Sequence, residues 1–221
     1  IQPIMNIKVI ISAVLVALLA ACSDADNNSK NPQSDVPNLA MPSIESFSDS
    51  LHGKRVELYW LKSDGIAAAI TNYGGRVVSL LVPDSLGKMT DVIMGFDSFN
   101  GFYESSEPYF GAIIGRYGNR IADGRFTING KNYTLPINNG KNTLHGGPGG
   151  FHNVVWDGKL IDDSTLELRY LSPNGEQGFP GNLTVTVTYT LTPGNELRLD
   201  YEAVTDAATP VNLTNHTYFN L

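Results

Sequence analysis

The sequence predicts an all-β fold, an antiparallel β-sandwich, for the chain from about Leu51 onward. Apolar residues occupy every second position of 183–191, with threonines between them, and this pattern is typical of a strand with one buried and one solvated face. The pair Asn129-Gly130 joins two short runs of strand-like composition, and Asn-Gly is the strongest short-range signal for a hairpin. No stretch after Leu51 shows apolar residues at helical spacing, which favours strands throughout.

The individual elements follow from the same pattern, taken in chain order. The first strands are expected at 55–61, 66–72, 77–82, 92–95 and 110–114, and the segment 99–105 is the one place where a short helix is expected. The Asn-Gly turn then joins strands at 125–128 and 131–135. Further strands are expected at 166–170, 183–191 and 197–203, and Pro193-Gly194-Asn195 should form the turn between the last two.

Length, composition and charge exclude several classes of protein. The chain has 221 residues, 42% of them hydrophobic and 17% charged, which suits one packed domain rather than a disordered chain or a coiled coil. The net charge is −7 and there is no basic run, which argues against a nucleic-acid partner. A single cysteine excludes an internal disulfide framework and any cysteine-rich zinc site.

That cysteine, Cys22, ends a segment typical of a secretion signal. Lys8 precedes an apolar run from Val9 to Ala21. This run is shorter than the roughly 20 residues that a helix needs to span a bilayer, but it suits the apolar part of a signal peptide. Small residues directly before Cys22 resemble the bacterial lipoprotein signal, and this resemblance implies lipidation of Cys22. By the same resemblance, the serine that follows Cys22 implies that the protein is sent to the outer membrane. An ordinary cleaved signal with an incidental cysteine is the alternative.

The next segment, 23–50, is rich in Ser, Asp, Asn and Pro and has almost no apolar periodicity, which favours a flexible linker. The expected organisation is therefore a lipoprotein signal peptide at 1–22, a linker at 23–50 and one domain at 51–221. The expected location is the bacterial cell envelope, on the periplasmic side, with the lipid as the only contact with a membrane.

Two of the four histidines stand in segments that suggest a site. His216 lies among polar and aromatic residues, which is costly in a core unless the polar groups meet each other or a ligand; a satisfied structural histidine is the alternative. His145 precedes Gly146-Gly147, which permits close approach of a ligand, and the alternative is a surface loop. His152 lies nearby, but the chain has no pair of histidines at helical spacing and no cysteine close to them. This argues against a zinc site.

The segment 115–121 places two arginines, Arg116 and Arg120, just after an expected buried strand. The arginine side chain presents a planar fork of donors that suits vicinal hydroxyls or carboxylates. The alternative interpretation is a surface charge pair with Asp123.

The last ten residues, Asn212-Leu213-Thr214-Asn215-His216-Thr217-Tyr218-Phe219-Asn220-Leu221, resemble the active-site signature of the aldose 1-epimerase (galactose mutarotase) family. The resemblance extends from about Ser46 to the end of the chain. The other matching stretches are, in order, 71–75, 82–84, 91–96, 115–121, 144–147 and 178–183.

This resemblance implies a large antiparallel sandwich, often called a supersandwich, with a sugar cleft on one face. It implies that the substrate is an aldohexose such as galactose or glucose, whose ring opens and recloses by acid–base transfer without a cofactor or metal. His216 would give a proton to the ring oxygen, and His145 would contact the sugar and support catalysis. Asn119 and Arg120 match the pair that hydrogen-bonds sugar hydroxyls.

The chain departs from the family pattern at one point. The family's general-base glutamate and substrate-binding aspartate come after the histidine signature, and Glu176 and Glu202 do not stand at matching positions. The domain is therefore expected to be C-terminally incomplete, and the 221-residue chain alone to be inactive. Three alternatives stay open: a non-catalytic sugar-binding lipoprotein, a hexose-6-phosphate mutarotase of the same fold, and a structural or adhesion sandwich.

Overall fold

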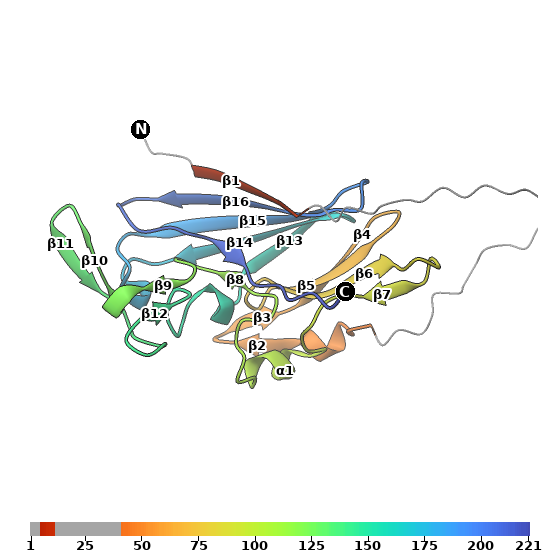
Figure 1. The fold of residues 1–221 in the computed structure, drawn as a ribbon, viewed down its shortest axis with the longest axis horizontal. Coiled ribbons are helices and arrows are strands. Elements are labelled where there is room, and N and C mark those ends of the chain that lie inside the picture. Colours follow the sequence, from red (N-terminus) through yellow and green to blue (C-terminus); the bar gives the residue numbers. More distant parts are fainter. Residues whose placement is uncertain (1–4, 12–40) are drawn as a thin grey trace, which may run out of the picture.

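The computed structural model describes residues 5–11 and 41–221 of the chain. Its largest layer is a five-stranded antiparallel sheet with the strand order β1-β16-β15-β14-β13, which lies across the top of Figure 1. Its strands are β1 Met5–Ile11, β13 Asp157–Asp162, β14 Thr165–Ser172, β15 Leu183–Leu191 and β16 Leu197–Thr205.

A four-stranded antiparallel sheet forms the second layer, with the order β4-β5-β6-β7. Its strands are β4 Leu58–Lys62, β5 Ala67–Thr71, β6 Arg76–Pro83 and β7 Met89–Asp91. The two sheets lie one below the other in Figure 1, with the connecting segments gathered at one end of the four-stranded sheet. The predicted all-β antiparallel sandwich is confirmed.

Short strand pairs complete the fold and carry the loops of interest. β8 pairs with β17, β9 with β12, β2 with β3, and β10 with β11 as the hairpin that projects at the left of Figure 1. Their bounds are β2 Asp49–Leu51, β3 Lys54–Val56, β8 Ile113–Ile114, β9 Arg120–Ile121, β10 Arg125–Ile128, β11 Lys131–Thr134, β12 Thr143–Leu144 and β17 Thr214–Asn215. The helical elements are α1 Phe99–Tyr103 and the 3₁₀ turns η1 Glu45–Phe47, η2 Ala122–Gly124, η3 Phe151–Asn153 and η4 Glu176–Gly178.

The main core lies between the two sheets. In β15 every odd-numbered residue from Leu183 to Leu191 is buried, while each threonine between them is partly exposed, as the alternation predicts. Side chains of β14, β15 and β16 meet side chains of β4, β5 and β6 in one cluster. Burying apolar side chains of this size contributes about 1.5–3 kcal/mol each.

The four-stranded sheet is covered on its other face as well. Ala69 and Val78 point away from the main core into a second cluster that includes Phe47 of η1 and two rings of α1, Phe99 and Phe102. A strand buried on both faces needs apolar residues at consecutive positions. This arrangement accounts for the burial of every residue of β6 from Arg76 to Leu81, where Ser79 is the one polar residue between apolar ones.

Four features of the fold differ from the sequence predictions. The single strand expected at 55–61 is divided into β3 and β4, with Glu57 between them. Residues 92–95 form no strand: only Ile93 makes an isolated bridge, to Phe219, and the edge strand is β7. The predicted strand 110–114 is shortened to β8, because Gly111 has a left-handed φ of 70° that interrupts an extended chain. β13 was missed, because four of its six residues are charged or glycine. The short helix expected at 99–105 is confirmed as α1.

The expected linker also ends earlier than residue 50. η1 and the first two residues of β2 fall within 23–50, and Phe47 is completely buried in the second core. The sparse apolar pattern of this segment concealed one aromatic residue that anchors it.

Part of the predicted signal region lies within the described residues. β1 forms an antiparallel pair with β16 in the register Met5 to Ala203 and Ile11 to Leu197, whereas Cys22 lies outside the described residues. In the part of the chain that is described, no helix is long and apolar enough to cross a membrane.

Candidate active site

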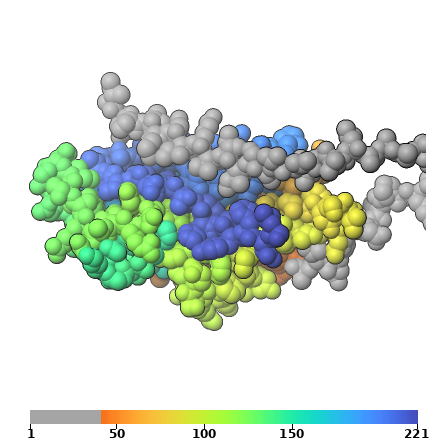
Figure 2. Space-filling model, in the orientation of Figure 1, coloured from red at the N-terminus to blue at the C-terminus, as the bar shows by residue number. Residues whose placement is uncertain are grey.

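His216 is held by strand pairing between distant parts of the chain. It directly follows β17, which pairs with β8. Its backbone N–H donates to the carbonyl of Ala112 at 2.8 Å, and its own carbonyl accepts from the N–H of Gly111 at 3.1 Å. The side-chain amide of Asn215 donates to the carbonyl of Gly111 at 3.0 Å. His216 is therefore fixed to the loop that leads into β8, and the C-terminal segment that carries it is seen in dark blue in Figure 2.

His145 reaches the same place from another strand pair. It follows β12, whose Leu144 is paired with Arg120 of β9, and its backbone N–H donates to the carbonyl of Asn119 at 3.0 Å. The chain then turns sharply through Gly146, where a Cβ atom would collide with the carbonyl oxygen of Gly115. Only glycine fits there, so Gly146 allows the loop after His145 to pass close to the backbone of Gly115.

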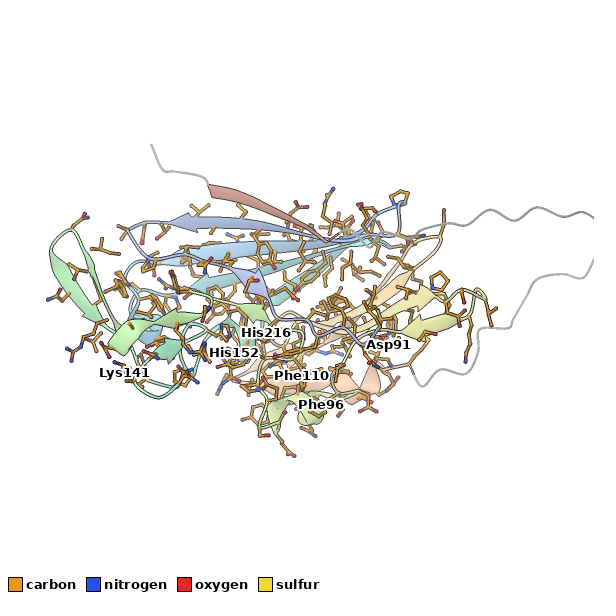
Figure 3. The ribbon with its side chains drawn as sticks, viewed as in Figure 1. Asp91, Phe96, Phe110, Lys141, His152 and His216 are labelled. Atoms are coloured by element: carbon orange, nitrogen blue, oxygen red, sulfur yellow. The ribbon has the colours of Figure 1, made fainter. Side chains whose placement is uncertain are left out.

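A tyrosine stands at the centre of the histidines. The ring centroid of Tyr109 lies 4.8 Å from His145, 4.8 Å from His152 and 5.6 Å from His216. The His145 and His216 rings are themselves 5.1 Å apart. In Figure 3 the labelled His152 and His216 lie side by side in the middle of the molecule, while Lys141 lies far to one side. The structure thus brings together the two predicted catalytic histidines.

The hydrogen-bond partner of His145 sets its tautomer. The backbone N–H of Asn119 donates to Nδ1 of His145 at 3.0 Å, so Nδ1 is an acceptor and the neutral ring carries its proton on Nε2. Burial, the nearby His216 and the Arg120 guanidinium together lower the pKa of His145 to about 4. His145 is therefore neutral at pH 7, and it offers a ligand an Nε2–H hydrogen bond rather than a proton.

This low pKa has a measurable consequence. We expect the imidazole signal of His145 to titrate near pH 4 in the folded protein, against about 6.5 for an unfolded histidine. Between these values the unfolded chain binds more protons, so the free energy of unfolding should fall as the pH drops from about 6.5 toward 4. NMR of labelled histidine checks this, with the chain in urea as control. A midpoint above pH 6 in the folded state would contradict the assignment of His145 as a partly buried, neutral ring that donates through Nε2–H.

Asn119 and Arg120 lie together at the solvent-exposed side of the histidine pair, His145 and His216. The Arg120 guanidinium donates to Oδ1 of Asn119 at 3.1 Å and, through Nε, to Oδ1 of Asn139 at 2.9 Å. Arg120 thus keeps donors on its free side for a ligand hydroxyl. The alternative pairing with Asp123 is not present, because Asp123 lies 3.6 Å from Lys141 instead.

The second arginine of this segment has a different role. Arg116 is only 2% exposed, and its donors are taken up by the protein itself. Its Nε atom bonds the hydroxyl of Ser172 at 2.8 Å, beside Glu176, which accepts hydroxyl bonds from Ser172 and Tyr170. Arg116 and Glu176 therefore hold the loops in place, while Glu202 is exposed on β16.

Two residues around the histidines were missed by sequence reasoning. Tyr109 gave no signal of its own, because a tyrosine before a buried strand is common in any β protein. Arg76 is 1% exposed, and its guanidinium donates to the carbonyls of His152 and Pro108 at 2.7 Å each. It packs against the Tyr73 ring, 4.6 Å from the ring centroid. Arg76 thus ties the backbone before Tyr109 to that of His152.

Comparison with known proteins identifies relatives of this arrangement. The sequence profile of the family described as Aldose 1-epimerase matches residues 57–221. A galactose mutarotase from Mus musculus is 48% identical over 169 residues, which are 76% of this chain and 48% of that protein. An aldose 1-epimerase from Escherichia coli K12 is 39% identical over 170 residues, 76% of this chain and 49% of that protein.

Solved structures agree. A galactose 1-epimerase from Lactobacillus acidophilus superposes with a TM-score of 0.69 at 31% identity, over 78% of this chain and 51% of that one. An aldose epimerase homologue from C. elegans gives 0.72 at 30% identity, over 75% of this chain and 51% of that one. The chain spans about half the length of the curated relatives that it matches. By its sequence and by its fold, the chain belongs to the aldose 1-epimerase family.

Proposed function

We propose that the protein is an isomerase that interconverts the α and β anomers of aldohexoses such as galactose and glucose. The observation that carries this proposal is the pairing of His145 and His216 at 5.1 Å, beside the donors of Asn119 and Arg120. The relatives named galactose mutarotase and aldose 1-epimerase support it.

In this proposal the two histidines have different tasks. His216 gives a proton to the ring oxygen, which breaks its bond to C1, and takes the proton back when the ring recloses. His145, which is neutral, donates an Nε2–H hydrogen bond to a sugar oxygen and holds the ring beside His216. Arg120 and Asn119 orient hydroxyls at the exposed rim. A correctly placed acid contributes about 10²–10⁴-fold to the rate.

Deprotonation of the C1 hydroxyl needs a proton acceptor. The resemblance to the family implies a glutamate that lies beyond Leu221, and Glu176 is already engaged by the hydroxyls of Ser172 and Tyr170. The proposed activity therefore belongs to the full-length protein.

The test is the rate at which freshly dissolved α-D-galactose changes its optical rotation. The full-length protein should accelerate this change well above the spontaneous rate measured in buffer alone. Binding of galactose with no acceleration would favour the non-catalytic sugar-binding alternative.

We also propose that Cys22 is lipidated and anchors the protein in the bacterial cell envelope. The small residues before Cys22 and the apolar run from Val9 to Ala21 support this. The wild-type protein should partition with membranes when expressed in bacteria with its N-terminal segment. The Cys22→Ser variant should be recovered in the aqueous fraction; membrane partition of that variant would refute lipidation at this cysteine.

A further inference from the structure

A second pocket opens beside Tyr109, next to the pair of histidines. It has a volume of about 320 Å³, within the roughly 300–1,000 Å³ range of small-molecule sites. We call it the side pocket, and the residues that characterise it are Tyr73, Phe102, Tyr103, Tyr109, His152 and Asn153. Since the Tyr109 ring also contacts His145 and His216, the side pocket lies one aromatic ring away from the candidate acid.

The walls of the side pocket are aromatic. Tyr73 and Tyr103 have ring centroids 6.3 Å apart, and Tyr103 is also stacked on Phe99 at 5.3 Å. Tyr73 donates its hydroxyl to Oδ1 of Asn153 at 2.7 Å, which fixes the amide with its nitrogen as the remaining polar group. Aromatic faces combined with a few oriented amides suit a ring that has both C–H faces and hydroxyls.

His152 contributes its ring to the lining of the side pocket, but not its unpaired polar atom. His152 is 3% exposed, and its Nδ1 atom has no hydrogen-bond partner within the described part of the chain. This atom is closed to solvent and lies beside Gly150, which is not part of the lining, so a ligand in the side pocket does not reach it. Burial and the Arg76 guanidinium lower the pKa of His152 to about 3, so the ring stays neutral.

The charge of the lining limits the ligand. No Asp, Glu, Lys or Arg is among the described residues that line the side pocket. The nearest cation, Arg76, directs its guanidinium to the carbonyls of His152 and Pro108. Such a pocket has no positively charged side chain to offset the negative charge of a phosphate or a carboxylate. It therefore favours a neutral ligand.

We propose that the side pocket is a second carbohydrate subsite, which holds a neutral pyranose ring linked to the aldose that reacts at His145 and His216. Residues 73, 103 and 153 would then set how strongly the protein binds substituted aldoses. The identity of the reacting sugar in this inference rests on the proposed function. The binding of the second ring does not depend on it.

The experiment compares D-glucose with cellobiose, a disaccharide with the same reducing unit. In the full-length protein, Tyr103→Ala and Asn153→Ala should each raise the KM for cellobiose by about 3–10-fold, as expected when one aromatic or amide contact is lost. The KM and kcat for glucose should stay within about twofold of wild type, because neither side chain contacts the histidine pair. Tyr133→Ala, which removes an aromatic residue from the distant β10–β11 hairpin, is the matched control.

Direct binding separates this inference from the proposed function. Cellobiose affinity is measured by calorimetry on the same variants, whether or not any sugar turns over. Weaker binding in Tyr103→Ala but not in Tyr133→Ala, without catalysis by the wild type, would sustain the subsite and refute the epimerase. Equal changes for glucose and cellobiose, or no change for either, would overturn the subsite.

Discussion

Replacement of His216 by alanine is expected to lower the kcat of anomer interconversion by about 10²–10⁴-fold, the usual contribution of a general acid. Without the imidazole, the ring oxygen must leave C1 without a proton donor at this position. The backbone bonds of His216 to Gly111 and Ala112 do not use its side chain, so the fold should persist. Polarimetry with α-D-galactose measures the effect, and binding of the sugar should weaken much less than turnover.

The control is His52→Ala, since His52 is exposed in the turn between β2 and β3. Unchanged turnover in His52→Ala together with lost turnover in His216→Ala would identify His216 as the general acid. Equal turnover in both variants would remove His216 from the mechanism and return it to the role of a structural histidine.

Arg116→Met is expected to destabilise the fold by about 3–5 kcal/mol, the scale for removing one member of a buried polar network. The guanidinium donates to the carbonyls of Ser172, Pro173 and Pro180 and to the hydroxyls of Ser172 and Thr209, at 2.8–3.3 Å. Methionine fills similar space but leaves these acceptors without a donor. Urea unfolding should show a midpoint lower by about 1–3 M.

Arg120→Met provides the comparison, because Arg120 is four residues away and exposed. Its free energy of unfolding should change by no more than about 0.5 kcal/mol, as for most surface substitutions. If the two variants unfolded at the same urea concentration, the distinction between a buried and a ligand-facing arginine would be wrong.

The sequence predicts the regular part of the fold well. The alternation of 183–191 and the Asn129-Gly130 turn appear as β15 and the β10–β11 hairpin, because one-sided burial and turn chemistry are local properties. β13 and the ordered segment around Phe47 were missed. Both depend on what packs against them from elsewhere in the chain, which period and composition do not reveal.

The same division applies to the candidate site. The signature around His216 and the glycines after His145 identified both histidines, and the structure places them 5.1 Å apart. Neither Tyr109 nor the contrast between Arg116 and Arg120 was predictable. Both arginines follow the same short strand, and Arg116 is the buried one because its guanidinium bonds Ser172 at the end of β14 and the carbonyl of Pro173 just after it.

The two-residue ladder of β8 and β17 joins positions that are 100 and 102 residues apart. Closing so long a segment carries a large entropic cost and gains only a few contacts. During refolding, His216 should therefore reach its position beside His145 after the β15–β16 hairpin has formed. Recovery of enzymatic turnover would then lag behind recovery of the far-ultraviolet circular dichroism signal.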